Sequence, residues 1–182
     1  MDELFWLSAH DYFLGSTVSP GHWGRVMSSC VVGESNSMGA ARLPLALREY
    51  IFEAVRLTQS PLRPSRLASL FLCPSLPAAQ QLLEREAPVR NHEYVYRVEL
   101  VDDVPVFQAS MDLAVIKPGD TVAAMTEKAR RYWRGYETRH MELLTMSPIR
   151  ICERISLDAP RGQMKRGNGA GIGASASPES LL

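Results

Sequence analysis

Short stretches of alternating apolar and polar residues follow one another directly in two parts of the chain, and this arrangement constrains the fold most. His92–Leu100 alternates well, and Val104–Leu113 follows it as a predicted hairpin partner. Met141–Thr145 and Ile149–Leu157 are predicted strands on either side of a Ser147-Pro148 turn. Parallel strands need a long crossover between them, so these pairs exclude a doubly wound parallel sheet. The sequence predicts an α+β fold with a mixed, mainly antiparallel sheet and flanking helices.

The longest predicted helix covers Leu43–Leu57. Pro44 suits its first turn, where the missing N–H has no intrahelical partner to lose. The small, polar segment Gly33–Arg42 is predicted to be a loop before this helix. The apolar residues at helical spacing predict one buried stripe, made of Leu47, Ile51, Ala54 and Val55.

The remaining predicted elements complete a single domain over residues 1–157. They are strands at Leu4–Ser8 and Leu67–Cys73, a helix opening at Pro77 and ending near Ala87, and a helix from Asp120 to Trp133. Residues 158–182 are rich in Gly, Ser and Ala and have no apolar periodicity, so they are predicted to form a disordered tail.

Composition and charge exclude several functional classes. The 20 basic and 20 acidic residues give no net charge, which argues against a dedicated nucleic-acid or membrane-surface binder. The first residues are acidic where a signal peptide needs basic ones, and no apolar run has membrane-spanning length. We therefore expect a monomer without a membrane partner, either cytoplasmic or exported without a cleaved signal peptide. The histidines and cysteines show no metal-ligand spacing, so no metal is expected, and no phosphate-binding loop or nucleophile elbow occurs.

One polar segment with chemical potential is RPSRLASLFL, residues 63–72. It places Ser65, Arg66 and Ser69 just before and inside an apolar strand. Hydroxyl and guanidinium groups at the mouth of a strand can hold a phosphorylated or dinucleotide ligand. The alternative is a Pro-rich turn in which Ser65 bonds its own backbone.

A second candidate is Glu142, which begins a predicted strand after a helix ending in Tyr132 and Trp133. A carboxylate on an otherwise apolar strand is costly to bury unless it has a partner or a function. The alternative is an exposed or salt-bridged glutamate at a strand end.

In combination, these segments resemble ADP-ribosyltransferases. The string HMELLTMSPIRICERI resembles the closing strand pair of that fold, in which a Glu and two apolar residues precede a Pro turn. RLASLFL resembles its serine-bearing strand, and FWLSAHDYFLGSTVSPGHWGR its opening strand and loop. The order of motifs is especially similar to small bacterial domains of unknown function associated with this fold. The resemblance implies a split sheet with NAD, as substrate, in its cleft.

The resemblance also implies roles for individual residues. Glu142 would be catalytic and stabilise an oxocarbenium-like transition state as nicotinamide leaves. Ser69, with Ser65 and Arg66, would lie on the nicotinamide and phosphate side of NAD. Tyr132 or Trp133 would stack on a ring of NAD or simply pack the helix. The acceptor of ADP-ribose stays open between protein, nucleic acid and a small molecule, as expected of a toxin, effector or defence protein.

Two positions depart from the resembled pattern. Trp6 stands where the family commonly has a polar residue on the first strand, and His140 where arginine-modifying members carry Glu or Gln. An inactive binding module on the same fold is therefore the alternative, with Glu142 exposed or paired with an arginine such as Arg97 or Arg150. A nucleic-acid binder using RYWRGYETR, residues 131–139, is a third hypothesis. The transferase hypothesis requires Glu142, Ser69 and the first strand to line one cleft.

Overall fold

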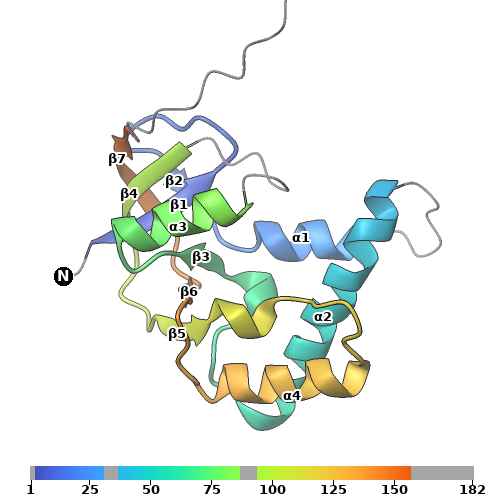
Figure 1. Cartoon of the computed structure of the whole chain (residues 1–182). Helices are drawn as coiled ribbons and strands as arrows, with labels where there is room; N and C mark the ends of the chain where they lie inside the picture. The colour runs from blue at the N-terminus through green and yellow to red at the C-terminus, as the bar shows by residue number, and fades with distance from the viewer. Residues whose placement is uncertain (1–2, 31–36, 87–93, 157–182) are drawn as a thin grey trace, which may run out of the picture.

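The computed structural model describes residues 3–30, 37–86 and 94–156, and these form two antiparallel sheets with flanking helices (Figure 1). The α+β prediction is confirmed. The first sheet has the order β1-β4-β7-β2, with β1 at Leu4–Ser8, β2 at Thr17–Val18, β4 at Tyr94–Leu100 and β7 at Ile149–Ile155. The second has the order β3-β6-β5, with β3 at Leu70–Leu72, β5 at Phe107–Ser110 and β6 at Met141–Thr145.

The two sheets meet where β1 passes the end of β3. Phe5 donates its backbone N–H to the Cys73 carbonyl at 3.0 Å, and Cys73 donates back to Phe5 at 2.8 Å. The chain also crosses between the sheets at the predicted Ser147-Pro148 turn, because β6 belongs to one sheet and β7 to the other. The Ser147 hydroxyl accepts a bond from the N–H of Asp102 at 2.9 Å and so ties this corner to the end of β4.

The predicted hairpin of His92–Leu100 with Val104–Leu113 is wrong. Both sides of β4 are taken by β1 and β7, and β5 pairs with β6 instead. The segment between β4 and β5 includes Pro105, which has no N–H to give to a ladder. Phe107 and Ala109 are instead buried in the core beneath the helices. Local alternation predicts where the strands are, but the pairing of the strands depends on packing between distant segments.

Within the described residues, four α-helices and two short 3-10 helices cover the sheets. In Figure 1, α3 lies across the β1–β4 region, while α2 and α4 pack together on the side of the three-stranded sheet. The helices are α1 at His22–Ser28, α2 at Ser37–Gln59, α3 at Leu76–Glu86 and α4 at Val122–Trp133, with η1 at Arg66–Ala68 and η2 at Met111–Ala114. No helix among the described residues has both the length and the apolar character needed to cross a membrane.

Helix α2 differs from its prediction in two ways. It begins at Ser37, so the second half of the predicted Gly33–Arg42 loop is helical, and Pro44 lies inside the helix. The buried stripe is also rotated, because Leu47 is 45% exposed. Buried positions recur every three residues at Ala46, Glu49, Phe52 and Val55, and Arg48 is buried beside them. The carboxylate of Glu49 occupies a core position of this helix, and a search for apolar stripes does not detect it.

Helix α1 was not predicted and determines where η1 lies. It packs closely on η1, because Gly24 faces the backbone of Leu67. A Cβ at Gly24 would overlap the Leu67 carbonyl oxygen, so only glycine permits this approach. Because η1 begins with Arg66, this contact helps to fix the direction of the Arg66 side chain.

Candidate functional site

Strand β6 presents its two faces to different parts of the core. Leu143 packs between the sheets, in a cluster with Leu72 and Ile149. Leu144 packs on the other face, against α2 and α4. Since side chains alternate along a strand, Glu142 shares the face of Leu144 and points toward these helices. It is 5% exposed.

The segment that was expected to be one strand at Leu67–Cys73 instead starts as a 3-10 turn. The Ser65 hydroxyl accepts a bond from the N–H of Leu67 at 3.2 Å and caps η1. The same hydroxyl donates to Glu53 of α2 at 2.9 Å. This turn directs Arg66 into the space between α2, α4 and β6, where it is 5% exposed.

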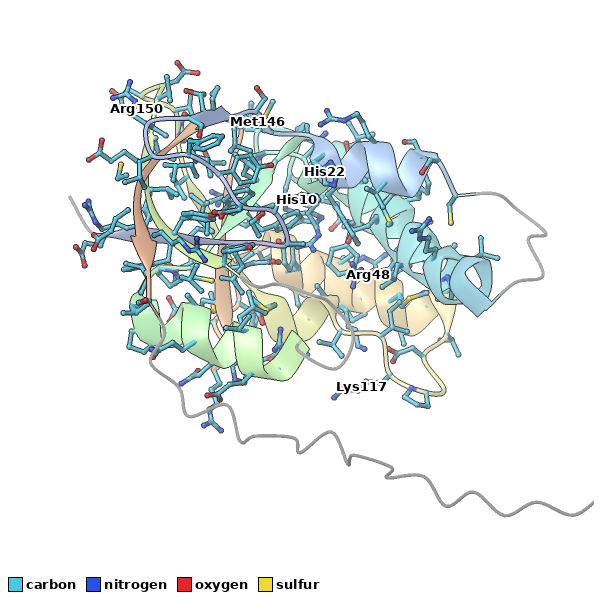
Figure 2. All side chains as sticks on the ribbon, turned by 90° about the horizontal axis from the view of Figure 1, so that it is seen from above. His10, His22, Arg48, Lys117, Met146 and Arg150 are labelled. Atoms are coloured by element: carbon cyan, nitrogen blue, oxygen red, sulfur yellow. The ribbon has the colours of Figure 1, made fainter. Side chains whose placement is uncertain are left out.

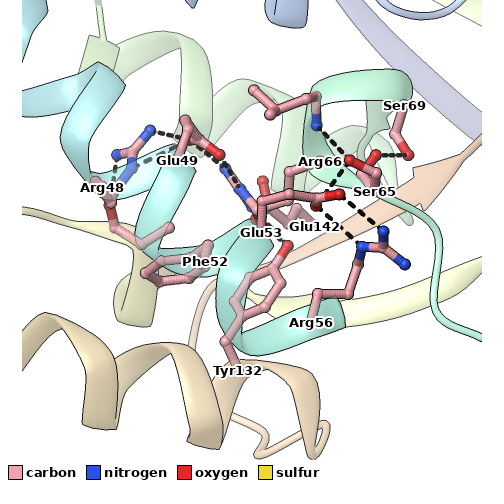
Figure 3. A network of polar contacts seen from close by, with 12 residues as sticks. Arg48, Glu49, Phe52, Glu53, Arg56, Ser65, Arg66, Ser69, Tyr132 and Glu142 are labelled. Atoms are coloured by element: carbon pink, nitrogen blue, oxygen red, sulfur yellow. Dashed lines mark hydrogen bonds and ion pairs between the residues drawn. The ribbon is translucent and has the colours of Figure 1, made fainter. Parts of the chain in front are cut away.

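Arg66 joins three elements through a buried polar network, drawn in Figure 3. Its Nε donates to Glu49 Oε2 of α2 at 2.9 Å. Its Nη1 donates to the Tyr132 hydroxyl of α4 at 2.5 Å and to Oε1 of Glu142. Tyr132 in turn donates to Glu142 Oε1 at 2.8 Å. One guanidinium group therefore connects two carboxylates and a phenol far apart in the sequence.

Arg48 completes the network and balances its charge. It forms an ion pair with Glu49, and its Nη1 donates to the carbonyl of Ala114 at 2.5 Å. Two arginines and two glutamates thus sum to zero charge, as a buried cluster requires. The Arg66 guanidinium also lies near aromatic rings, 4.8 Å from the Phe71 centroid and 5.0 Å from that of Tyr132. Such contacts further stabilise a desolvated cation.

The network shifts the pKa values of its members in opposite directions. Burial alone would raise the pKa of Glu49, but the adjacent Arg66 and Arg48 outweigh burial and lower it to about 2. Burial also opposes the charge of Arg66, yet Glu142 and Glu49 raise its pKa well above the usual value. The pKa of Tyr132 is raised by burial and by Glu142, so its hydroxyl keeps its proton as a donor.

Glu142 is held through only one of its two oxygens. Both Arg66 and Tyr132 bond to Oε1. Within the described part of the chain no hydrogen bond to Oε2 is found, and this oxygen is not among the fully enclosed atoms that lack a partner, so it keeps some contact with solvent. Glu142 lines neither of the two main surface hollows formed by the described residues. The arrangement can orient a carboxylate and leave one oxygen to act on a group that reaches it.

The other expected site residues are close by, but their side chains make hydrogen bonds to the backbone within the fold. Ser69 is 2% exposed, and its hydroxyl donates to the Ser65 carbonyl at 2.7 Å. Trp133 is 1% exposed, donates to the Phe52 carbonyl at 2.8 Å and stacks on Phe107. The structure therefore brings Glu142, Arg66, Ser65 and Ser69 together and places Trp133 in the core behind them.

The first strand contributes to a different face. Trp6 packs with Tyr12 and Tyr96 in the cluster between the sheets, whereas Glu142 faces the helices. Glu142 and Ser69 are both buried, and neither they nor any residue of the first strand lines the surface hollows at α3 and at Trp133. The requirement that Glu142, Ser69 and the first strand line one cleft is therefore not met. The polar position that Trp6 occupies is not part of the Glu142 network.

The arginine expected to pair with Glu142 in an inactive module is also a different one. Arg97 forms its ion pair with Glu153. Arg150 lies at the start of β7, and Figure 2 shows it far from Arg48, which belongs to α2 and to the network. The partner is Arg66, for which the resemblance implies a place on the nicotinamide and phosphate side of NAD.

The aromatic residues of the 131–139 stretch do not form an open stacking surface. Tyr132 and Trp133 are buried, and only Tyr136 is exposed, with the Arg131 guanidinium 5.4 Å from its ring centroid. This arrangement removes most of the support for the nucleic-acid hypothesis. Among the described residues, no group of three or more His, Cys, Asp or Glu side chains is placed to hold a metal ion.

Sequence comparison assigns the chain to a family. Residues 32–157, more than half of the chain, match the family described as a protein of unknown function, DUF2441. The chain belongs to the DUF2441 family. The matched region contains the whole Arg48–Glu49–Arg66–Tyr132–Glu142 network and leaves out β1, β2 and α1. No curated protein matches the chain.

Two members of the network, Arg48 and Glu49, were not predicted, because they lie outside the apolar stripe expected for their helix. Tyr132 was predicted to stack on a ring of NAD or to pack its helix, and it instead donates to Glu142. The available signal was the spacing of Glu49 three residues from both Ala46 and Phe52. A charge at such a position predicts a buried partner.

Proposed function

We propose that this chain is an NAD-dependent ADP-ribosyltransferase in which Glu142 is the catalytic carboxylate. The observation that carries the proposal is the clamping of Glu142 through Oε1 with Oε2 left unbonded by the described residues. The split sheet, the strand that bears Glu142 and the Ser147-Pro148 turn agree with the order of elements that the resemblance implies.

The proposed reaction breaks one bond and forms one. The bond between C1′ of the ribose and the nicotinamide nitrogen breaks, and its electron pair leaves with neutral nicotinamide. The ribose then carries positive charge, which a fixed carboxylate stabilises better than mobile water does. An acceptor nucleophile attacks C1′ and releases its proton. Glu142 is the group that faces the developing charge, and Ser65, Arg66 and Ser69 form the adjacent turn.

Arg66 is a positioning residue in this proposal. It and Tyr132 hold Oε1, which leaves the carboxylate little rotational freedom. Preorganised groups need no reorientation as charge develops, and this is the main source of electrostatic catalysis. Entry of NAD requires the Ser65–Ser69 turn or the helices around it to open, because Glu142 is 5% exposed.

The test is release of nicotinamide from NAD labelled in the nicotinamide ring, with adenine-labelled NAD used in parallel to detect transfer. Purified chain is incubated alone and with fractionated protein, nucleic-acid and small-molecule extracts. Glu142→Gln keeps the shape and an acceptor oxygen, and we expect it to lower the rate by at least about 100-fold. The matched control is Glu153→Gln, an exposed glutamate paired with Arg97, which should leave the rate unchanged.

A second candidate function is a binding module that does not cleave NAD. The observation in its favour is that Glu142 is enclosed and paired with Arg66. The two candidates separate in the same experiment. If folded wild-type chain releases no nicotinamide with any fraction, or if Glu142→Gln matches wild type, the transferase proposal is overturned and the binding module remains.

A further inference from the structure

A second polar cluster lies where the chain enters β6, outside the buried network. Asp112 in η2 accepts a bond from the Thr138 hydroxyl at 2.6 Å. The other oxygen of Asp112 lies 2.8 Å from Nδ1 of His140, whose backbone N–H also points at this carboxylate, at 3.3 Å. Asp112 therefore fixes both the main chain and the ring of His140, and Nε2 is the ring nitrogen left for another partner.

A surface hollow that encloses about 30 Å³ and is open to solvent at its mouth adjoins this cluster. It lies between α3 and the residues around the start of β6. Its polar lining consists of Gln81, Arg85, Arg139 and His140, and its apolar lining of Ala78, Leu82, Met111 and Met141. This volume is about that of one water molecule, so a ligand binds at the open mouth of the hollow, which suits one small group and not a whole dinucleotide.

The charges around the hollow favour an anion. Arg85 lies 3.6 Å from Asp112, while Arg139 has no ion-pair partner among the residues that the structure describes. Two arginines therefore line the hollow, and the one carboxylate paired with either of them, Asp112, lies next to it, which leaves a positive charge. A guanidinium group presents several N–H donors in a plane that matches the oxygens of a phosphate.

We propose that this hollow binds a phosphate-type anion, held by Arg85, Arg139 and Nε2 of His140. The proposal does not depend on NAD cleavage, because none of these residues contacts Glu142 or Arg66. The hollow beside Trp133 also has two arginines, but Arg63 lies over the Phe107 ring at 4.5 Å and no histidine lines it. Its Arg134 therefore serves as a matched control.

The experiment titrates the purified full chain with inorganic phosphate while sodium chloride keeps the ionic strength constant. Nuclear magnetic resonance follows the His140 imidazole, and calorimetry gives the affinity. We expect saturable binding to wild type and about tenfold weaker binding to Arg139→Gln, which loses a charged hydrogen bond. Arg134→Gln should bind as wild type does. Both arginines are at the surface, and thermal unfolding checks that the variants are folded.

Two results would overturn the proposal. One is a His140 response to sodium chloride equal to that with phosphate, which indicates screening alone. The other is equal weakening by Arg139→Gln and Arg134→Gln, which indicates a diffuse charge effect. A parallel titration with AMP separates the sources of the anion. Equal affinity means that the phosphate group alone is recognised, and tighter AMP binding means that a nucleoside lies beside it; both support the site.

Discussion

The buried network around Arg66 and the exposed cluster around Asp112 are only two residues apart in the sequence, because Glu142 belongs to the first and His140 to the second. The solvent exposure of their side chains is nevertheless very different. The side chains of Glu49 and Glu142 are 0% and 6% exposed. Those of Asp112 and His140 are 35% and 31% exposed. Exposed groups can exchange a lost partner for water, whereas buried charges cannot. The contrast indicates that the first cluster fixes the fold around one carboxylate, while the second stays open to solvent, as the proposed anion site requires.

The largest expected effect comes from removing the shared cation of the buried network. Arg66→Met leaves Glu49 and Glu142 without their common partner, and breaking a buried pair typically costs about 3–5 kcal/mol. We expect the free energy of unfolding, measured in urea, to fall by this amount. Arg97→Met, which breaks an exposed pair with Glu153, is the control and should change stability little. An equal loss of unfolding free energy in the two variants would contradict the distinction between buried and exposed ion pairs.

Acid should weaken the buried network over a defined range. The pKa of Glu49 is lowered in the folded state from 4.5 to about 2, so its contribution is fully present above the unfolded value. That contribution is lost as the pH falls through 4.5 toward 2, and it amounts to roughly 3 kcal/mol. Urea unfolding at successive pH values measures the loss. Glu49→Gln should show a smaller decrease over the same range, and an unchanged decrease would contradict the assignment.

Removing a single hydroxyl from the network should have an intermediate effect. Tyr132→Phe deletes the donor to Glu142 and the acceptor for Arg66 while keeping the buried ring. We expect stability to fall by about 1–3 kcal/mol. The exposed Tyr136→Phe is the control in the same thermal or urea unfolding series. A loss in both variants would indicate a general effect of tyrosine removal.

The smallest effect is expected in the exposed cluster. Asp112→Asn removes the charge that faces His140 and Arg85 but keeps the side-chain shape, and the cost should stay below about 1 kcal/mol. Glu49→Gln is the same acid-to-amide change in the buried network and should cost clearly more. Urea unfolding at neutral pH compares the two directly. If Asp112→Asn were the more damaging change, the exposed cluster would be a structural element and not a ligand site.

Local patterns predicted most elements but not their partners. β1, β4, β6 and β7 and the helices α3 and α4 lie close to their predicted positions because alternation and caps are local signals. The pairing of β5 with β6 depends on contacts between distant segments, which period alone does not encode. The early start of α2 at Ser37 shows that the small residues before Pro44 can also adopt helical backbone, which the turn signals did not predict.

The candidate site was predicted in part for a related reason. Glu142 was identified because a charge on an apolar strand needs an explanation, and Arg66 because it lies at a strand mouth. Their direct pairing joins positions 76 residues apart, which no local pattern reveals. Glu49 carries the same kind of signal as Glu142, but the predicted stripe through Leu47 assigned it to the solvent side.

The crossing from one sheet to the other at Ser147-Pro148 has a consequence for how this chain can change in length. β6 is paired on both sides, and its alternation decides which side chains face the helices. Deleting one residue between Gly135 and Ser147 would turn Glu142 toward the apolar space between the sheets. We therefore expect related sequences to have no insertions or deletions between Gly135 and Ser147, while their surface loops can vary in length.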